Sequence, residues 1–390
     1  MTVVARLPCG KRASYYQDRH IDEEIPMPAP FRADQVGSLL RPASLLAARE
    51  AWRRGALSTP ELAQREDEAI RDAVRKQESI GLAAVTDGEF RREWWHLDFL
   101  RQLDGVTLRE NPGPRFGGTE QQPPIATVTG PVRYRQPIMI EQFRFLKGLT
   151  RHTAKWTIPS PSMLHLRGGR NAVSREAYPD LEPFWADVAA AYGHAIAAFA
   201  AAGCTYLQLD DVGFAYLGDE KFRASCLRNG DDPGQLPRRY ADTINAALRD
   251  RPRDLTVTMH TCHGNFRSSW ATEGGYDWVA ESMFQSAVDG FFMEFDSARS
   301  GTFEPLRLLP RNKKVILGLV TTKSGQLETE EDLVRRIDEA ARYVPLENLC
   351  LSPQCGFSSH ETGNKLTEDE QWRKLERVVA VARKVWGTEA

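Results

Sequence analysis

The sequence predicts a single α/β domain folded as a (β/α)8 barrel, the TIM-barrel architecture. Eight short apolar runs alternate with helical patterns along the 390 residues, and such an alternation calls for a parallel sheet. Seven of the runs end in a polar residue, which favours a closed barrel over a doubly wound open sheet, because the carboxyl ends of barrel strands form one mouth. These strand-end residues are Ser38, Glu89, Ser160, Asp210, His260, Glu294 and Cys355.

The chain begins with a segment that does not fit this alternation. Residues 1–30 are polar, interrupted by prolines and without periodicity, and we interpret them as an arm that packs on the body or on a partner subunit. The second arrangement would make the protein a homo-oligomer. The barrel is expected over residues 31–390 as one domain, since barrels with insertions reach this length.

The expected elements follow in order. Helical patterns lie at residues 43–80, 138–149, 181–202, 239–248, 276–286, 330–343 and 368–385. The first pattern breaks at Ser58, before Thr59 and Pro60, where a new helix is expected to start, and Thr329 is expected to cap the helix at 330–343. The strands are expected at residues 31–38, 81–89, 155–162, 204–211, 255–264, 290–294, 314–320 and 349–355.

An inserted region follows the second strand. Residues 91–124 are irregular and contain a loop rich in glycine and proline at 111–118, and a loop of this length is more often functional than idle. Residues 125–130 have the pattern of a strand, but no full crossover helix precedes them, so we place this strand outside the main alternation. The Trp94–His96 segment either lines the barrel mouth over a flat or apolar substrate or packs the loop.

A histidine and a cysteine lie two positions apart near the end of the fifth strand. Residues two apart in a strand share a face, so His260 and Cys262 are expected to point the same way, as two ligands of one metal ion would. Glu294 and Cys355 close the sixth and eighth runs and would complete a tetrahedral zinc site. The alternative is that both cysteines are small buried residues and His260 is hydrogen-bonded in the core. His263 points off this face, which indicates a supporting or surface role.

Composition limits the expected partners. The chain has 51 Lys and Arg against 53 Asp and Glu, mixed along its length, so neither nucleic acid nor an anionic membrane is expected to bind. Six cysteines spread over 390 residues do not make a disulfide framework, and the N-terminus lacks the apolar core of a signal peptide. No run reaches transmembrane length. These features favour a cytoplasmic protein that acts on small molecules.

Six short motifs, taken together, carry a family resemblance. In chain order they are Val36-Gly37-Ser38, Asp87-Gly88-Glu89, Gln208-Leu209-Asp210, His260-Thr261-Cys262, Met293-Glu294 and Ser352-Pro353-Gln354-Cys355-Gly356. The ordered set resembles the catalytic C-terminal barrel of cobalamin-independent methionine synthase. It is more similar still to the short, single-barrel bacterial relatives of that enzyme. The resemblance runs from Ala33 to about Trp386.

The resemblance implies a zinc cofactor and a thiol substrate that meets the zinc through sulfur. The implied activity is thiol S-alkyl transfer, in which homocysteine takes a methyl group from a folate or another methyl donor and becomes methionine. Elementary chemistry agrees, because a free thiol with a pKa near 8.5 is mostly protonated at neutral pH and a metal-bound one is not. The implied zinc ligands are His260, Cys262, Glu294 and Cys355.

The resemblance also implies how the thiol substrate is held. Ser38 and its neighbouring backbone would bind a substrate carboxylate, and Glu89 and Asp210 would bind the substrate ammonium group. Two carboxylates suit an ammonium group and repel a sulfonate. This favours an amino-acid thiol such as homocysteine.

Two departures from the family leave the alkyl donor open. The long methionine synthases carry a second, N-terminal barrel that helps to bind folate, and this chain has only a short arm there. The family's histidine after the seventh strand, implied to assist protonation of the leaving folate, is replaced at about Lys323, which becomes the candidate catalytic residue.

Two other functions compete with methyl transfer. Short relatives of this type include epoxyalkane:coenzyme M transferases, in which a thiol activated by zinc opens an epoxide. The other alternative is that the protein is not an enzyme but a barrel with a structural zinc ion, because structural zinc sites are closed by four protein ligands. A carboxylate is an uncommon ligand beside two thiolates in such sites, and an incoming sulfur could displace it.

Overall fold

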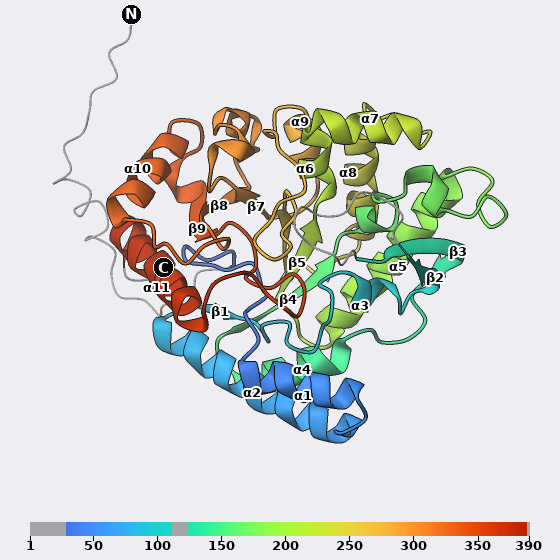
Figure 1. The fold of residues 1–390 in the computed structure, drawn as a ribbon. Helices are drawn as coiled ribbons and strands as arrows, with labels where there is room; N and C mark the ends of the chain where they lie inside the picture. Colours follow the sequence, from blue (N-terminus) through green and yellow to red (C-terminus); the bar gives the residue numbers. More distant parts are fainter. Residues whose placement is uncertain (1–28, 111–122, 388–390) are drawn as a thin grey trace, which may run out of the picture.

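The barrel sheet is built from seven parallel strands. In this computed structural model of the protein, residues 29–110 and 123–387 are described, and each strand pairs with the next in parallel (Figure 1). In sheet order the strands are β1 (Ala84–Val85), β4 (Thr153–Pro159), β5 (Tyr206–Asp211), β6 (Thr256–Thr261), β7 (Gly290–Glu294), β8 (Lys314–Val320) and β9 (Leu349–Pro353).

The segment before the first helix closes the ring between β9 and β1. Ala33 forms an isolated parallel bridge with Leu351 of β9, and the N–H of Leu39 donates to the carbonyl of Gly88 at 3.0 Å. The strand expected at residues 31–38 is reduced to this bridge, because the backbone carbonyls of the segment are used by side chains. The carbonyls of Gln35, Val36 and Gly37 accept from the side chains of Lys155, Gln208 and Thr86.

Helices surround the sheet (Figure 1), and most of the expected ones are confirmed. The break predicted at Ser58 is a capping box, in which Glu61 accepts from the Ser58 N–H at 2.8 Å. Thr329 accepts from the Asp332 N–H at 3.1 Å, as expected of a cap. These helices are α1 (Ala43–Arg53), α2 (Thr59–Ile80), α4 (Ile140–Leu149), α5 (Glu182–Ala201), α8 (Leu236–Ala247), α10 (Glu330–Ala340) and α11 (Glu368–Trp386).

The helix predictions were incomplete in two respects. The helix expected at residues 276–286 is only the short α9 (Ala280–Met283), flanked by turns. The sequence also did not predict α3 (Leu97–Leu100), α6 (Gly213–Gly218) and α7 (Glu220–Arg228). Five of the six residues of α6 are buried, so it shows none of the one-sided periodicity by which a surface helix is recognised. Short 3-10 helices lie at Pro161–Leu164, Gly169–Ala172, Ala298–Ser300, Glu304–Leu308 and Leu346–Asn348.

The insertion after β1 forms a separate two-stranded sheet. β3 (Ile125–Arg133) pairs antiparallel with β2 (Asp104–Arg109), away from the barrel sheet and beside α5 (Figure 1). The prediction that the strand at residues 125–130 lies outside the main alternation is confirmed. Its partner β2 was missed, since it is only partly buried and lies in a segment that was interpreted as irregular.

Parts of the sequence-based interpretation lie outside the described residues. The arm predicted at residues 1–30, apart from Ala29 and Pro30, is one of them, and the glycine- and proline-rich loop at 111–118 is the other. Among the helices of the described ranges, none combines the length and the apolar character that crossing a membrane requires.

Strand register brings polar strand ends together. Pro159 of β4 pairs with Asp210 of β5, and Asp210 pairs with His260 of β6. Glu294 is the last residue of β7 and pairs with Gly318 of β8. Because all these strands are parallel, their carboxyl ends gather at one mouth of the barrel.

Candidate metal centre

Four ligand-type side chains meet at this mouth. His260 lies in β6, Cys262 follows that strand directly, Glu294 ends β7, and Cys355 lies just beyond β9. One ligand atom from each side chain lies within 4.8 Å of the other three, and all four residues are buried. The fold thus brings together every residue that the sequence singled out as a zinc ligand.

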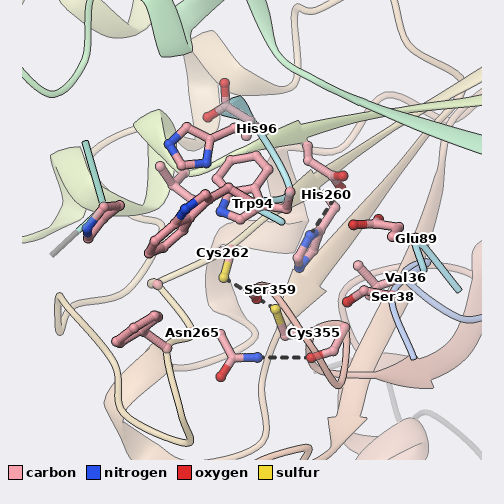
Figure 2. A pocket seen from close by; sticks show the side chains of 18 of the residues that line it. Val36, Ser38, Glu89, Trp94, His96, His260, Cys262, Asn265, Cys355 and Ser359 are labelled. Atoms are coloured by element: carbon pink, nitrogen blue, oxygen red, sulfur yellow. Dashed lines mark hydrogen bonds and ion pairs between the residues drawn. The ribbon is translucent and has the colours of Figure 1, made fainter. Parts of the chain in front are cut away.

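The spacing of the two sulfurs fits one shared metal ion. The Sγ atoms of Cys262 and Cys355 are 3.5 Å apart (Figure 2). A disulfide would need about 2.05 Å. Two thiolates on one tetrahedral zinc ion, each at about 2.3 Å, would lie about 3.8 Å apart. Two sulfurs, an imidazole and a carboxylate are also donors that zinc accepts.

Two of the four side chains, those of Cys355 and Glu294, favour their anionic form. The hydrogen bond with Cys262 lowers the pKa of Cys355 well below its usual value, and the same bond, together with burial, raises that of Cys262. Although burial favours a neutral imidazole, hydrogen bonds to Asp210 and Cys355 raise the pKa of His260 to about 10. Thiolate and carboxylate charges at one buried point attract a cation.

A second layer of side chains fixes Glu294. One carboxylate oxygen lies 3.1 Å from Nδ1 of His263 and accepts from Arg299 at 3.1 Å, and the other accepts from Gln354 at 3.1 Å. Burial opposes ionisation, but the bond to His263 and the charges of Lys323 and Arg299 lower the pKa of Glu294 below its usual range. His263 is fully buried, so of its two expected roles the supporting one is realised.

A pocket with an empty volume of about 630 Å³ opens over the cluster. His260, Cys262 and Cys355 form part of its lining, which also includes the predicted substrate-binding residues Ser38, Glu89 and Asp210. Figure 2 shows Glu89 and Ser38 on one side of His260 and the cysteines, with His96 and Trp94 on the other.

Glu89 is held with one carboxylate oxygen available. Its backbone is left-handed, with φ of 60°, an uncommon conformation outside glycine that is found at functional sites. Oε1 accepts from Thr157 at 2.8 Å, whereas Oε2 is buried and accepts no hydrogen bond from the described residues. Burial raises the pKa of Glu89 to about 7, Arg92 opposes the shift, and Asp210 adds to it.

Ser38 sits where the segment before α1 touches the loop after β9. Its Oγ accepts from the Ser358 N–H at 3.2 Å, and its carbonyl accepts from the Phe357 N–H at 2.9 Å. Gly356 allows this approach, because a Cβ there would lie 2.0 Å from the Ser38 oxygen. Asp210, the third predicted binding residue, accepts from Gln208 at 2.7 Å.

Aromatic side chains form the opposite wall. Trp94 stacks on Phe266 with ring centroids 5.7 Å apart and an angle of 10° between the planes. The ring of His360 lies 4.2 Å from that of Trp94. Trp94, Trp95 and His96 all line the pocket, as one of the two sequence-based interpretations of this segment proposed.

Lys323, the predicted catalytic residue, lies outside the pocket lining. Its Nζ lies 3.5 Å from Oδ1 of Asn265, a residue that does line the pocket. Its charge acts on Glu294 and Cys262. A direct catalytic role for Lys323 stays a prediction, and its position supports an electrostatic contribution.

Other lining residues were missed by sequence reasoning. Arg167 comes from a loop between two 3-10 helices, Tyr216 from α6, and Asn265 and Phe266 from the loop after β6. No periodicity marks the inward face of such segments, so the sequence offered no signal for them.

A second group of possible metal ligands lies at Glu93, His360 and Glu361. Glu361 is already paired with Arg49 at 3.3 Å and also with Arg53. The guanidinium groups of Arg49 and Arg53 therefore already pair with the Glu361 carboxylate. The candidate metal centre remains the cluster of His260, Cys262, Glu294 and Cys355.

The mouth of the barrel gathers two thiols, an imidazole and a carboxylate under a pocket, as in barrel enzymes whose donor groups could hold a metal ion. The model of the family described as cobalamin-independent synthase, catalytic domain, matches residues 31–384. The chain belongs to this family of methionine synthase-like transferases, as the sequence motifs indicated.

Individual relatives agree with this assignment. The uncharacterized protein YxjH of Bacillus subtilis (strain 168) is 48% identical over 92% of this chain and 95% of its own. A solved structure described as a putative vitamin-B12 independent methionine synthase from Listeria monocytogenes shares 39% identity, with a TM-score of 0.74 over 93% of this chain and 99% of that one. A 5-methyltetrahydropteroyltriglutamate–homocysteine methyltransferase of Acidiphilium cryptum (strain JF-5) is 26% identical over 93% of this chain, which spans 44% of that protein's length.

Proposed function

We propose that the protein is a zinc-dependent S-methyltransferase that moves a methyl group from a folate or another methyl donor to homocysteine, giving methionine. The observation that carries the proposal is the buried group of His260, Cys262, Glu294 and Cys355 beneath a pocket. Family membership and the reaction named for the Acidiphilium relative support the same class of chemistry.

The four side chains would hold the zinc ion. Bound there, zinc would supply a Lewis acid that favours the deprotonated form of a thiol at neutral pH. His263, Arg299 and Gln354 hold the Glu294 carboxylate in place. Because such supporting bonds orient ligands, they preorganise the group for one metal position.

The acidic side of the pocket would bind the amino-acid part of homocysteine. Oε2 of Glu89, which lies 3.7 Å from Arg92 without a hydrogen bond, and the carboxylate of Asp210 would accept hydrogen bonds from the ammonium group. Of the described residues, none accepts the hydroxyl proton of Ser38, which can therefore be donated to the substrate carboxylate. These contacts would aim the sulfur at the metal cluster.

In the transfer itself, the homocysteine sulfur gives up its proton and forms a bond to the methyl carbon. The bond from that carbon to its leaving atom breaks at the same time, and the leaving atom takes up a proton. The chain's part is to align the two substrates and to exclude water. The aromatic wall of Trp94 and Phe266 would cover the donor side of this pair.

The proposal is tested by product analysis. Zinc-loaded protein is incubated with homocysteine, coenzyme M or glutathione, and each thiol is combined in turn with methyl-folate, methylcobalamin and small epoxides. The products are identified by mass spectrometry. We expect methionine from homocysteine and one of the methyl donors. An epoxide adduct of coenzyme M without any methionine would replace the proposal by epoxide opening, and no product in any pairing would favour a non-catalytic barrel.

A further inference from the structure

Three residues on the pocket wall carry buried polar atoms that lack a hydrogen-bond partner among the described residues. Both ring nitrogens of His96, Nε of Arg167 and the hydroxyl of Tyr216 are buried and make no hydrogen bond in the described part of the chain. All three residues line the pocket over the metal cluster. His96 is 1% exposed and Tyr216 is 6% exposed, so water does not readily replace their missing partners, whereas Arg167 is partly exposed.

Such groups are costly to leave unpaired. A buried donor without a partner costs on the order of 1–3 kcal/mol, and native structures contain few of them. Arg167 stands out further because no carboxylate of the described residues pairs with it, whereas Arg92 lies 3.7 Å from Glu89 and Arg299 lies 3.1 Å from Glu294. A cation and two potential donors facing a cavity suit an anionic ligand.

All three residues line one pocket, and the charge of Arg167 acts on the other two. The charge of Arg167 reaches both neighbours: burial lowers the pKa of His96 and Arg167 lowers it further, while burial raises that of Tyr216 to about 12 against the effect of Arg167. At neutral pH the hydroxyl and the neutral imidazole can each donate one hydrogen bond.

His96 lies away from Glu89 and Ser38 in the pocket (Figure 2), whose lining also includes Asp210 and Asp211. Figure 2 shows His96 on the opposite side of His260 from Glu89 and Ser38. The ammonium and carboxylate of homocysteine share one carbon atom, so when the ammonium meets Glu89 the carboxylate is on the same side. A ligand anion at Arg167 must then belong to the other substrate.

We propose that His96, Arg167 and Tyr216 form a subsite for an anionic oxygen group, a carboxylate, sulfonate or phosphate, on the methyl donor. The assignment to the donor rests on the function proposed above, whereas the anion subsite itself rests on the geometry of the three side chains. The donor is accordingly an acid with its anionic group placed beyond the reacting methyl carbon.

Direct binding tests the subsite. Zinc-loaded protein, without thiol, is titrated by calorimetry with acetate, methanesulfonate and inorganic phosphate, which distinguish the kinds of anion. We expect saturable binding of at least one anion, weakened about tenfold or more by Arg167→Met and severalfold by Tyr216→Phe. Arg238→Met, an exposed arginine paired with Asp242 on α8, is the matched control and should bind as the wild type does. Tyr216→Phe removes only one oxygen atom, so it keeps the test valid if Arg167→Met fails to fold.

Two outcomes overturn the subsite: no saturable binding of any of the three anions, or equal binding by the wild type and both variants. A third outcome concerns the donor alone. Homocysteine affinity should be unchanged in Arg167→Met, and a parallel loss of homocysteine and anion binding would contradict the assignment to the donor. If anion binding depends on Arg167 but no methyl donor yields methionine, the subsite stands and the proposed function fails.

Discussion

At the scale of single residues, the proposed zinc site depends on two thiols, those of Cys262 and Cys355. Cys262→Ser and Cys355→Ser each exchange a soft thiolate for a poor neutral ligand, so each variant should lose its zinc and its activity while keeping a cooperative melting transition. Metal analysis of the purified variants measures this. Cys226→Ser is the control, because Cys226 is a buried free thiol on α7 outside the cluster, and it should keep its zinc. Full zinc in either cluster variant would remove that cysteine from the ligand set.

The carboxylates on the acidic side make a separate prediction. Glu89→Gln and Asp210→Asn each remove a charge-assisted hydrogen bond to the ammonium group, worth roughly 1.5–3 kcal/mol, so homocysteine affinity should fall about tenfold or more. Mercaptoethanol lacks the ammonium group and should bind all three proteins alike. Unchanged homocysteine binding in both variants would rule out an amino-acid thiol.

The raised pKa of Glu89 should make the stability of the folded protein depend on pH. This pKa is raised from 4.5 to about 7 in the folded protein, chiefly by burial, so the folded state holds this proton more tightly than the unfolded state does. The resulting contribution to stability is complete below pH 4.5 and is lost as the pH rises through about 7. Melting temperatures of wild type and Glu89→Gln should therefore diverge between these pH values, with the variant gaining relative to the wild type. Parallel curves would show that Glu89 does not carry this raised pKa.

At the scale of elements, the loop after β9 packs against the segment before α1 at Gly356 and Ser38, where we propose that the substrate carboxylate binds. A Cβ at Gly356 would lie 2.0 Å from Oγ of Ser38, so Gly356→Ala should push Ser38 away and weaken homocysteine binding while zinc is retained. Isothermal titration and metal analysis of the same sample measure both. Gly148→Ala on α4 is the control, because nothing lies within 4 Å of a Cβ there. Equal homocysteine affinity in the two variants would separate Ser38 from substrate binding.

The elements show which parts of the fold the sequence could predict. Strands with continuous apolar runs were predicted well, and β8 has the predicted bounds of Lys314–Val320. The candidate metal ligands could be predicted from the sequence for two reasons. Residues two apart in a strand share a face, and the carboxyl ends of barrel strands meet at one mouth, so neither inference needs the three-dimensional structure. The segment at residues 31–38 was predicted as a strand because its residue pattern does not reveal that distant side chains bond its carbonyls.

The pocket wall that contains Arg167 and Tyr216 could not be predicted from the sequence for a related reason. Arg167 and Tyr216 face the same cavity only because a loop after β4 and helix α6 fold over the mouth. Neither segment has a period that identifies its inner face. Their missing hydrogen bonds become visible only in three dimensions, because an unpaired buried atom is a property of its surroundings.

At the scale of the whole molecule, the barrel separates two tasks. Its strands position the four candidate metal ligands, each at or near a strand's carboxyl end, while loops and α6 supply walls of the pocket that we propose select the substrates. In the proposed function, one metal position, an acidic side for the thiol and an anion subsite for the donor would give each substrate one orientation.

We propose that the four-residue cluster of His260, Cys262, Glu294 and Cys355 holds one metal ion that meets the sulfur of the substrate. The direct measurement is the visible spectrum of the cobalt-substituted protein, recorded with homocysteine and, as a control, with homoserine, which has oxygen in place of sulfur. We predict about one metal ion per chain and a spectral change with homocysteine but not with homoserine. A protein that binds no metal, or a metal spectrum that homocysteine leaves unchanged, would contradict the account.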